Sequence, residues 1–161
     1  MSDRAASLLE SLGFTRVYHY TPGKDGWLTM GLPTEGPDAA TPRAGDVADR
    51  DTPTCAPCER LGDVRDRLRA AGKTSCIVVN DQRAVLGRLR GESLDGDAGQ
   101  TVEAVMEAGP TTVRPSEPLE ALIERMQKRK VESIVVSTAD GVLVGVLRRE
   151  DGERRLSERK D

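Results

Sequence analysis

The chain has 161 residues, of which 37% are apolar and 32% are charged, and its net charge is -3. This composition is typical of a soluble globular protein and argues against a nucleic-acid-binding protein, because basic and acidic residues are interleaved in similar numbers. No apolar run approaches the roughly 20 residues of a membrane span and the polar start is unlike a signal peptide, so we expect a cytoplasmic protein without membrane or nucleic-acid partners.

Residues 1–36 form the first predicted unit, and they contain all four aromatic residues. Leu8, Leu9 and Leu12 lie on one face of a short predicted helix, which Gly13 ends. A unit of this size is too small to be stable alone. We therefore expect its apolar side chains to pack on the rest of the chain or on a second copy.

The alternating stretch after this helix, residues 16–20, predicts a strand, which Pro22 and Gly23 turn. It contains the only histidine of the chain, His19. A lone histidine between two tyrosines is more often a packing residue than a base or a metal ligand, so we assign it no role. Residues 37–45 are rich in Pro, Gly and Ala and are predicted to form a linker.

The strongest signal is an internal repeat, in which residues 54–93 align with residues 112–151 without a gap. Self-similarity over this length predicts two copies of a small module that bury a shared apolar face. The identical pairs include Thr54 with Thr112, Pro57 with Pro115, Gly87 with Gly145, and Arg90 with Arg148. The predicted domains are residues 46–98 for the first copy, residues 99–157 for the second and residues 158–161 for a tail.

Each copy is predicted to contain a short strand, a helix, two strands and a second helix. The helix of the first copy carries Leu61, Val64 and Leu68 and ends at Gly72, which favours a left-handed cap. Lys130 takes the place of Gly72 in the second copy, which predicts a weaker or differently shaped cap. The longer strands are predicted at residues 76–79, 84–89, 133–136 and 142–147. We expect the long helices of the two copies to share one interior.

The closest match to a known pattern lies in residues 102–106, which lead to residues 111–115, and in residues 143–151. Together with the order of elements, these stretches resemble the cystathionine-beta-synthase (CBS) domain over roughly residues 46–157. The resemblance implies an α/β (α+β) fold, with two β-α-β-β-α copies related by a pseudo-two-fold axis. It also implies a regulatory protein rather than an enzyme, commonly a homodimer, that binds an adenosine-containing ligand such as AMP, ATP or S-adenosylmethionine between the copies.

In that family a glycine after the last strand is followed by a hydroxyl residue that meets phosphate and an aspartate that holds the ribose. Gly145 and Asp151 match this pattern here, whereas Arg148 stands at the hydroxyl position. The first copy has Ser93 opposite Asp151 and so lacks the carboxylate, which accepts two hydrogen bonds from vicinal hydroxyls. The resemblance therefore implies one ribose site at Asp151, with Arg148 for phosphate near the last helix. The other implied lining residues are Thr112, Val113 and Arg114.

A second resemblance lies in the first unit. Its helix, the turn at residues 13–14, Trp27 and the finish at residues 31–33 resemble the C-terminal end of a rhodanese-like domain over residues 4–36. In rhodaneses the reactive cysteine precedes that helix, whereas the first cysteine here is Cys55. The segment therefore lacks the family's route to a persulfide, and we expect that the enzyme was lost or that the true start lies upstream.

Cys55 and Cys58 have the C-x-x-C spacing of redox and zinc motifs. A redox pair needs the head of a helix after a full strand, and zinc needs four ligands, for which the distant Cys76 and His19 are not a convincing set. Cys55 aligns with Val113 in the other copy, where a small, partly apolar residue fits. We therefore favour a structural role and no metal site or cofactor.

Three functions stay open at this point. The favoured one is a regulatory protein that binds an adenosine-containing ligand between the copies. The second is a truncated or inactive rhodanese-type sulfurtransferase fused to the repeats. The third is a ligandless interaction scaffold, in which Arg90 and Arg148 are solvated or form ion pairs with nearby acids.

Overall fold

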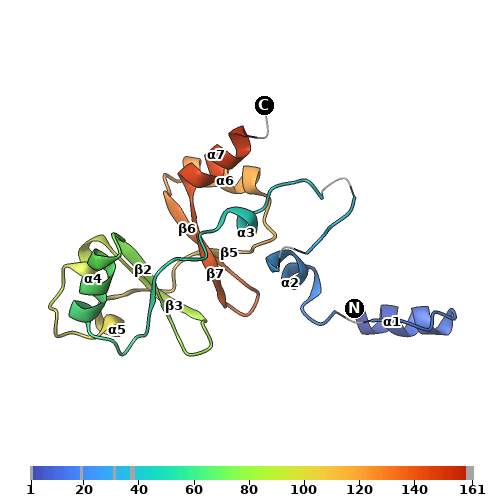
Figure 1. Cartoon of the computed structure of the whole chain (residues 1–161), viewed down its shortest axis with the longest axis horizontal. Coiled ribbons are helices and arrows are strands. Elements are labelled where there is room, and N and C mark those ends of the chain that lie inside the picture. Colours follow the sequence, from blue (N-terminus) through green and yellow to red (C-terminus); the bar gives the residue numbers. More distant parts are fainter. Residues whose placement is uncertain (1, 19, 31, 37–38, 159–161) are drawn as a thin grey trace.

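The structure is a computed structural model that describes residues 2–18, 20–30, 32–36 and 39–158. His19 lies outside the described residues, as do the last three residues of the predicted tail. Figure 1 shows the two repeats as neighbouring units, from which the N-terminal helices extend away. Within the described ranges, no helix is both long enough and apolar enough to cross a membrane.

The N-terminal unit contains two helices, α1 (Ser2–Ser11) and α2 (Gly23–Thr29). The first was predicted, and Gly13 ends it with a φ of 92°. The strand predicted over residues 16–20 is wrong for the described residues of that stretch, none of which belongs to a strand. A strand without a neighbouring strand leaves its backbone groups unpaired, which disfavours a strand here. The side chain of Tyr18 in this stretch is 86% exposed.

The first repeat has the predicted order of elements. Its helix α4 buries Leu61, Val64 and Leu68 on one face. In the sheet, β1 runs parallel to β2, and β2 is antiparallel to β3. A fourth short strand, β4, pairs with the outer edge of β3. The bounds are β1 Thr54–Cys55, α4 Leu61–Ala70, β2 Ser75–Val79, β3 Val85–Arg90, the one-turn helix η1 Gly91–Leu94, and β4 Glu107–Ala108.

The second repeat has the same order and register. Ile134 pairs with Leu147 where Cys76 pairs with Leu89 in the first repeat, which confirms the shift of 58 residues. The helix α6 buries Leu119, Leu122, Ile123 and Met126. The last helix, α7, is a full helix where the first repeat has only η1. The bounds are β5 Thr112–Val113, α6 Leu119–Lys128, β6 Ser133–Ser137, β7 Leu143–Arg148 and α7 Arg149–Ser157.

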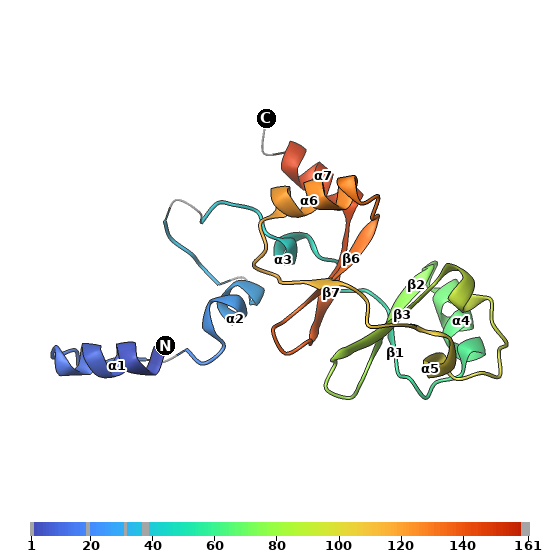
Figure 2. The same cartoon turned by 180° about the vertical axis from the view of Figure 1, so that it is seen from behind.

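The short segments before the repeats are exchanged between them. The helix α3 (Ala44–Val47) precedes the first repeat but packs on the second, whereas α5 (Val102–Val105) precedes the second and packs on the first. Figures 1 and 2 both show α3 beside α6 and α7, and α5 beside α4. The predicted domain boundaries stay a prediction, to which the structure adds this exchange.

Matching backbone hydrogen bonds hold the two exchanged segments. The amide of Ala44 donates to the carbonyl of Glu117, and the equivalent amide of Val102 donates to Glu59, both at 2.9 Å. Asp49 forms a β-bridge with Val146 on β7, and the equivalent pair in the first repeat is Glu107 on β4 with Arg88 on β3. Each repeat is therefore completed by a segment that lies next to the other repeat in the sequence.

The two long helices do not share one interior, so that expectation is wrong. Leu119 belongs to one buried cluster and Leu61 to another. A third cluster, which joins the repeats, contains Ile77 from β2 and Val135 from β6. Because successive strand residues point to opposite faces, each sheet lies between its own helix and the shared interior.

The caps of α4 and α6 have the same shape, which corrects the expectation for Lys130. Gly72 has a φ of 62° and Lys130 has a φ of 55°. The amide after each residue donates 2.9 Å to a carbonyl in the last helical turn, from Lys73 to Leu68 and from Val131 to Met126. A residue with a Cβ atom therefore adopts the left-handed conformation that glycine favours, and the same local hydrogen bond closes both caps.

Replacing Lys130 with glycine is expected to stabilise the protein by about 0.5–1 kcal/mol, because glycine adopts this conformation without the steric cost of a Cβ atom. Urea denaturation measures the change as a higher midpoint with an unchanged slope. The matched control is Gly72→Ala, which is expected to destabilise by a similar amount. A midpoint for Lys130→Gly below that of the original chain would contradict the strain argument.

Candidate functional site

A cleft of about 1550 Å³ lies between the repeats. Its walls are formed where β1 and β2 begin and β3 ends, and where β5 and β6 begin and β7 ends. The lining contains equivalent residues from both repeats, such as Ser75 with Ser133 and Arg90 with Arg148. The two related halves therefore open into one space, which exceeds the roughly 300–1,000 Å³ of ordinary ligand pockets.

Three of the six predicted binding residues line this cleft, namely Thr112, Val113 and Arg148. The first two form β5, and Arg148 ends β7, directly before α7. The other three, Gly145, Asp151 and Arg114, are not among the lining residues.

Each of these three residues contacts another part of the chain instead. The carboxylate of Asp151, one residue beyond the lining residue Glu150, accepts a hydrogen bond from Arg154 within α7. Arg114 donates to the carbonyl of Thr138 in the turn between β6 and β7. A Cβ atom at Gly145 would lie 2.5 Å from the carbonyl oxygen of Asp49, so this position accommodates the exchanged segment.

The cleft is basic although the chain is acidic. Eight of its lining side chains are basic and five are acidic, whereas the whole chain has a net charge of -3. The ion pairs around the cleft are partly solvated, so each contributes little stability. They join Lys73 to Asp49 at 3.7 Å, Arg90 to Glu107 at 3.1 Å, Arg125 to Glu117 at 2.6 Å, and Arg148 to Glu150 at 4.0 Å.

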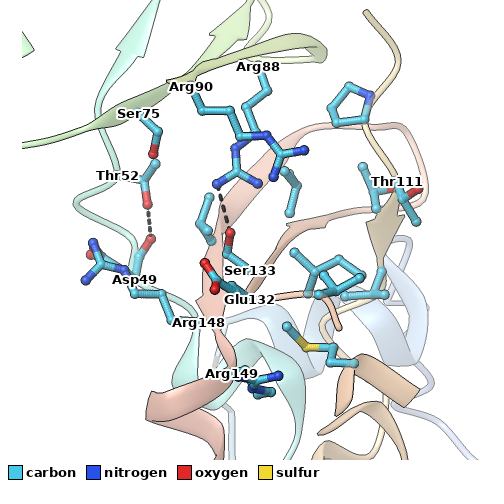
Figure 3. Close-up of a pocket in the computed structure, with 18 of the residues that line it drawn as sticks. Asp49, Thr52, Ser75, Arg88, Arg90, Thr111, Glu132, Ser133, Arg148 and Arg149 are labelled. Atoms are coloured by element: carbon cyan, nitrogen blue, oxygen red, sulfur yellow. Dashed lines mark hydrogen bonds between the residues drawn. The ribbon is translucent and has the colours of Figure 1, made fainter. Parts of the chain in front are cut away.

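Sequence reasoning missed Arg88, a lining residue on β3 that is only 8% exposed. Its Nη2 atom donates to the Oγ atom of Ser133 in the other repeat at 2.8 Å. Figure 3 shows Arg88 and Arg90 pointing from β3 into the cleft, opposite Ser133. Burial and the nearby charge of Arg90 lower the pKa of Arg88, against the opposing effect of Glu107. The sequence contained one signal for this residue. Arg88 and Arg90 are two positions apart in a predicted strand, so their side chains lie on the same face of it.

The two cysteines of the C-x-x-C motif, Cys55 and Cys58, do not form a pair in the structure. Cys55 and Cys76 are buried with their Sγ atoms 3.3 Å apart, whereas Cys58 is exposed. The hydrogen bond with Cys76 and burial raise the pKa of Cys55, so it stays a thiol near neutral pH. Among the described residues, no group of three or more His, Cys, Asp or Glu side chains is arranged to hold a metal ion.

We compared the sequence and the structure with known proteins. Residues 102–157 match the family model of the CBS domain. The crystal structure of CBSX2 in complex with AMP is 22% identical, has a TM-score of 0.65, and covers 74% of this chain and 98% of that chain. The fold is that of a CBS domain pair. CBSX2 from Arabidopsis thaliana is also similar, with 22% identity, a TM-score of 0.66, and coverage of 75% of this chain and 98% of that chain.

Two further solved structures are similar to this chain. The CBS domain pair of protein MJ0100, in complex with 5'-methylthioadenosine and S-adenosyl-L-methionine, is 16% identical with a TM-score of 0.62, covering 74% of this chain and 98% of that chain. The cytosolic domain of the Mg2+ channel MgtE, in complex with ATP, is 20% identical with a TM-score of 0.64, covering 70% and 48%. No curated protein matches the sequence.

The comparisons bear on the two sequence resemblances differently. The CBS family model covers the second repeat, and the structural neighbours extend the CBS-pair fold over both repeats. The family match does not reach residues 4–36. The rhodanese-like resemblance of that segment therefore stays a prediction.

Proposed function

We propose that this CBS pair is a regulatory module that binds an adenosine-containing ligand in the cleft between its repeats. The observation that carries the proposal is the cleft itself, which is large, basic and lined by both repeats. Structural neighbours with the same fold were solved with AMP, with ATP, and with 5'-methylthioadenosine and S-adenosyl-L-methionine. Occupancy of a cleft with walls from both repeats would change how the repeats pack, which is how binding is relayed.

The proposed binding residues are those that sequence reasoning named. Thr112 and Val113 are proposed to contact the ligand from the wall of the cleft, and Arg148 is proposed to bind its phosphate. Asp151 is proposed to bind ribose hydroxyls, for which its contact with Arg154 must be exchanged for the ligand. Gly145 and Arg114 are proposed to act on the site indirectly, through the exchanged segment and the β6–β7 turn. No catalytic residue or cofactor is part of the proposal.

The proposal includes a cytoplasmic location and a homodimer. In the described part of the N-terminal unit, seven large apolar side chains are exposed, which favours contact with a second copy. They are Leu8, Leu9, Leu12, Phe14, Tyr18, Trp27 and Met30. A sedimentation experiment that found only monomers at micromolar concentration would remove the dimer from the proposal.

A thermal-shift panel of AMP, ADP, ATP and S-adenosylmethionine tests the function. A ligand at a hundredfold its dissociation constant adds about 2.7 kcal/mol. For a chain of this size, that raises the melting temperature by roughly 5–11 °C. Absence of a shift with all four compounds would favour the ligandless scaffold, and sulfur-transfer activity would revive the rhodanese alternative.

The ribose role has its own pair of variants. Asp151→Ala is expected to abolish the shift, whereas Ser93→Ala, at the equivalent position of the first repeat, is expected to leave it unchanged. Ser93 accepts a hydrogen bond from the amide of Arg90 at 2.8 Å, so its removal alters local capping only. Equal loss from both variants would contradict a single ribose site.

A further inference from the structure

Arg88 is a buried cation without an ion pair of its own among the described residues. No carboxylate of the described residues forms an ion pair with it, and its Nε atom is buried without a hydrogen-bond partner. Placing an unpaired cation inside a protein costs free energy unless another group compensates the charge. A compensating anion is therefore missing from the contacts that the chain itself supplies.

The groups around Arg88 add positive charge to the same place. Arg90 is two residues further along β3 and points into the same cleft (Figure 3). Its charge lowers the pKa of Arg88, and the carboxylate of Glu107, which opposes this effect, is already bound to Arg90 at 3.1 Å. Ser133 occupies only the Nη2 atom of Arg88. Two neighbouring guanidinium groups thus share one carboxylate.

The second repeat does not need a cation at the equivalent position, which is occupied by Val146. Val146 is buried in the cluster that joins the repeats. An apolar side chain therefore satisfies the packing that this fold requires there. At this position the cleft therefore carries an additional charge on the side of the first repeat only.

We propose that Arg88 binds the phosphate oxygens of a nucleotide in this cleft. A guanidinium presents its Nε and Nη donors side by side, and this geometry matches two oxygens of one phosphate group. The cleft consequently selects phosphorylated adenosine ligands over neutral adenosine and over S-adenosylmethionine, whose sulfonium group is positively charged. The adenosine part of this inference rests on the proposed function, whereas the anion part rests on Arg88.

The test compares Arg88→Met with Arg69→Met in the full chain. Methionine keeps most of the apolar stem of Arg88 and removes the charge. Arg69 lies on α4, outside the cleft, with 75% of its side chain exposed, so its variant controls for net charge. Calorimetric titrations use ATP, adenosine, S-adenosylmethionine and inorganic tripolyphosphate as probes.

Arg88→Met is expected to weaken ATP and tripolyphosphate binding about tenfold to a hundredfold, as loss of hydrogen bonds to a charged group does. Arg69→Met is expected to leave both affinities unchanged. The ligand-free Arg88→Met protein is expected to be at least as stable to urea as the original chain, because it no longer buries an unpaired charge. A purely structural arginine would instead give lower stability with unchanged ATP affinity.

The outcomes separate this inference from the proposed function. If ATP and adenosine bind equally well and Arg88→Met changes neither, the phosphate role is overturned while adenosine binding stands. If tripolyphosphate binds through Arg88 but adenosine adds nothing to its affinity, the anion site stands and the proposed function fails. If no probe binds, both are overturned.

Discussion

Replacing Leu119 with alanine is expected to destabilise the protein by about 2–5 kcal/mol. Leu119 is fully buried at the start of α6, in the cluster that also contains Val113 and Leu147. Removing its side chain leaves a cavity between α6 and the sheet of its own repeat, which the packed surroundings fill only partly. Urea denaturation of the full chain measures the loss.

The matched control is Leu12→Ala in the N-terminal segment. Leu12 is 67% exposed, so its truncation is expected to change the free energy of unfolding by no more than about 0.5 kcal/mol. Comparable losses from the two variants would mean that the N-terminal segment folds onto the repeats in solution.

The same cluster assignment predicts how mutations in the two repeats combine. Val64 lies in the cluster of α4 and Ile123 in the cluster of α6, with no common partner among the buried residues. The losses from Val64→Ala and Ile123→Val are therefore expected to add within about 0.5 kcal/mol. A coupling energy above about 1 kcal/mol would indicate that the helices share one interior after all.

Replacing Gly145 with alanine is expected to cost about 3 kcal/mol, at the upper end of the range for overpacked sites. The new Cβ atom would lie 2.5 Å from the carbonyl oxygen of Asp49 and 2.9 Å from its carbonyl carbon. Backbone atoms cannot move aside as a side-chain end does. The exchanged segment must therefore shift, which strains its two hydrogen bonds with Val146.

Gly87→Ala is the control at the equivalent position of the first repeat. Its Cβ atom would lie 2.5 Å from Sδ and 2.9 Å from Cγ of Met106, a flexible side chain that can move, and 3.1 Å from the carbonyl oxygen of Glu107. We expect a loss of about 1 kcal/mol there. Thermal unfolding separates the two, since about 3 kcal/mol lowers the melting temperature of this chain by roughly 6–12 °C. Equal shifts would argue that Asp49 does not lie against Gly145.

The Gly145→Ala variant also links the fold to the cleft. Asp49 belongs to the exchanged segment and lines the cleft, where it pairs with Lys73 of the first repeat. A segment displaced by the added methyl group would carry Asp49 away from that wall. Gly145, which the sequence motif marks as a ligand residue, lies against the backbone of Asp49 in this structure.

The candidate site was only partly readable from the sequence. Thr112, Val113 and Arg148 follow from the repeat and the CBS resemblance, because the motif specifies their place on β5 and β7. Arg88 does not belong to that motif, and in sequence it is one of many arginines. Its burial arises only when β3 and β6 face each other across the cleft, which brings Ser133 within 2.8 Å of it.

The sequence by itself determined the repeat, the order of elements within each copy and the apolar faces of α4 and α6, since these follow from local periodicity and turn residues. Tertiary structure alone decided which elements pack together. Residues 43–49 lie next to the first repeat in the sequence, yet their backbone groups pair with the second, because that is where unpaired partners lie. Tertiary structure also placed the charge of Arg88 inside the cleft, where Ser133 of the other repeat contacts it.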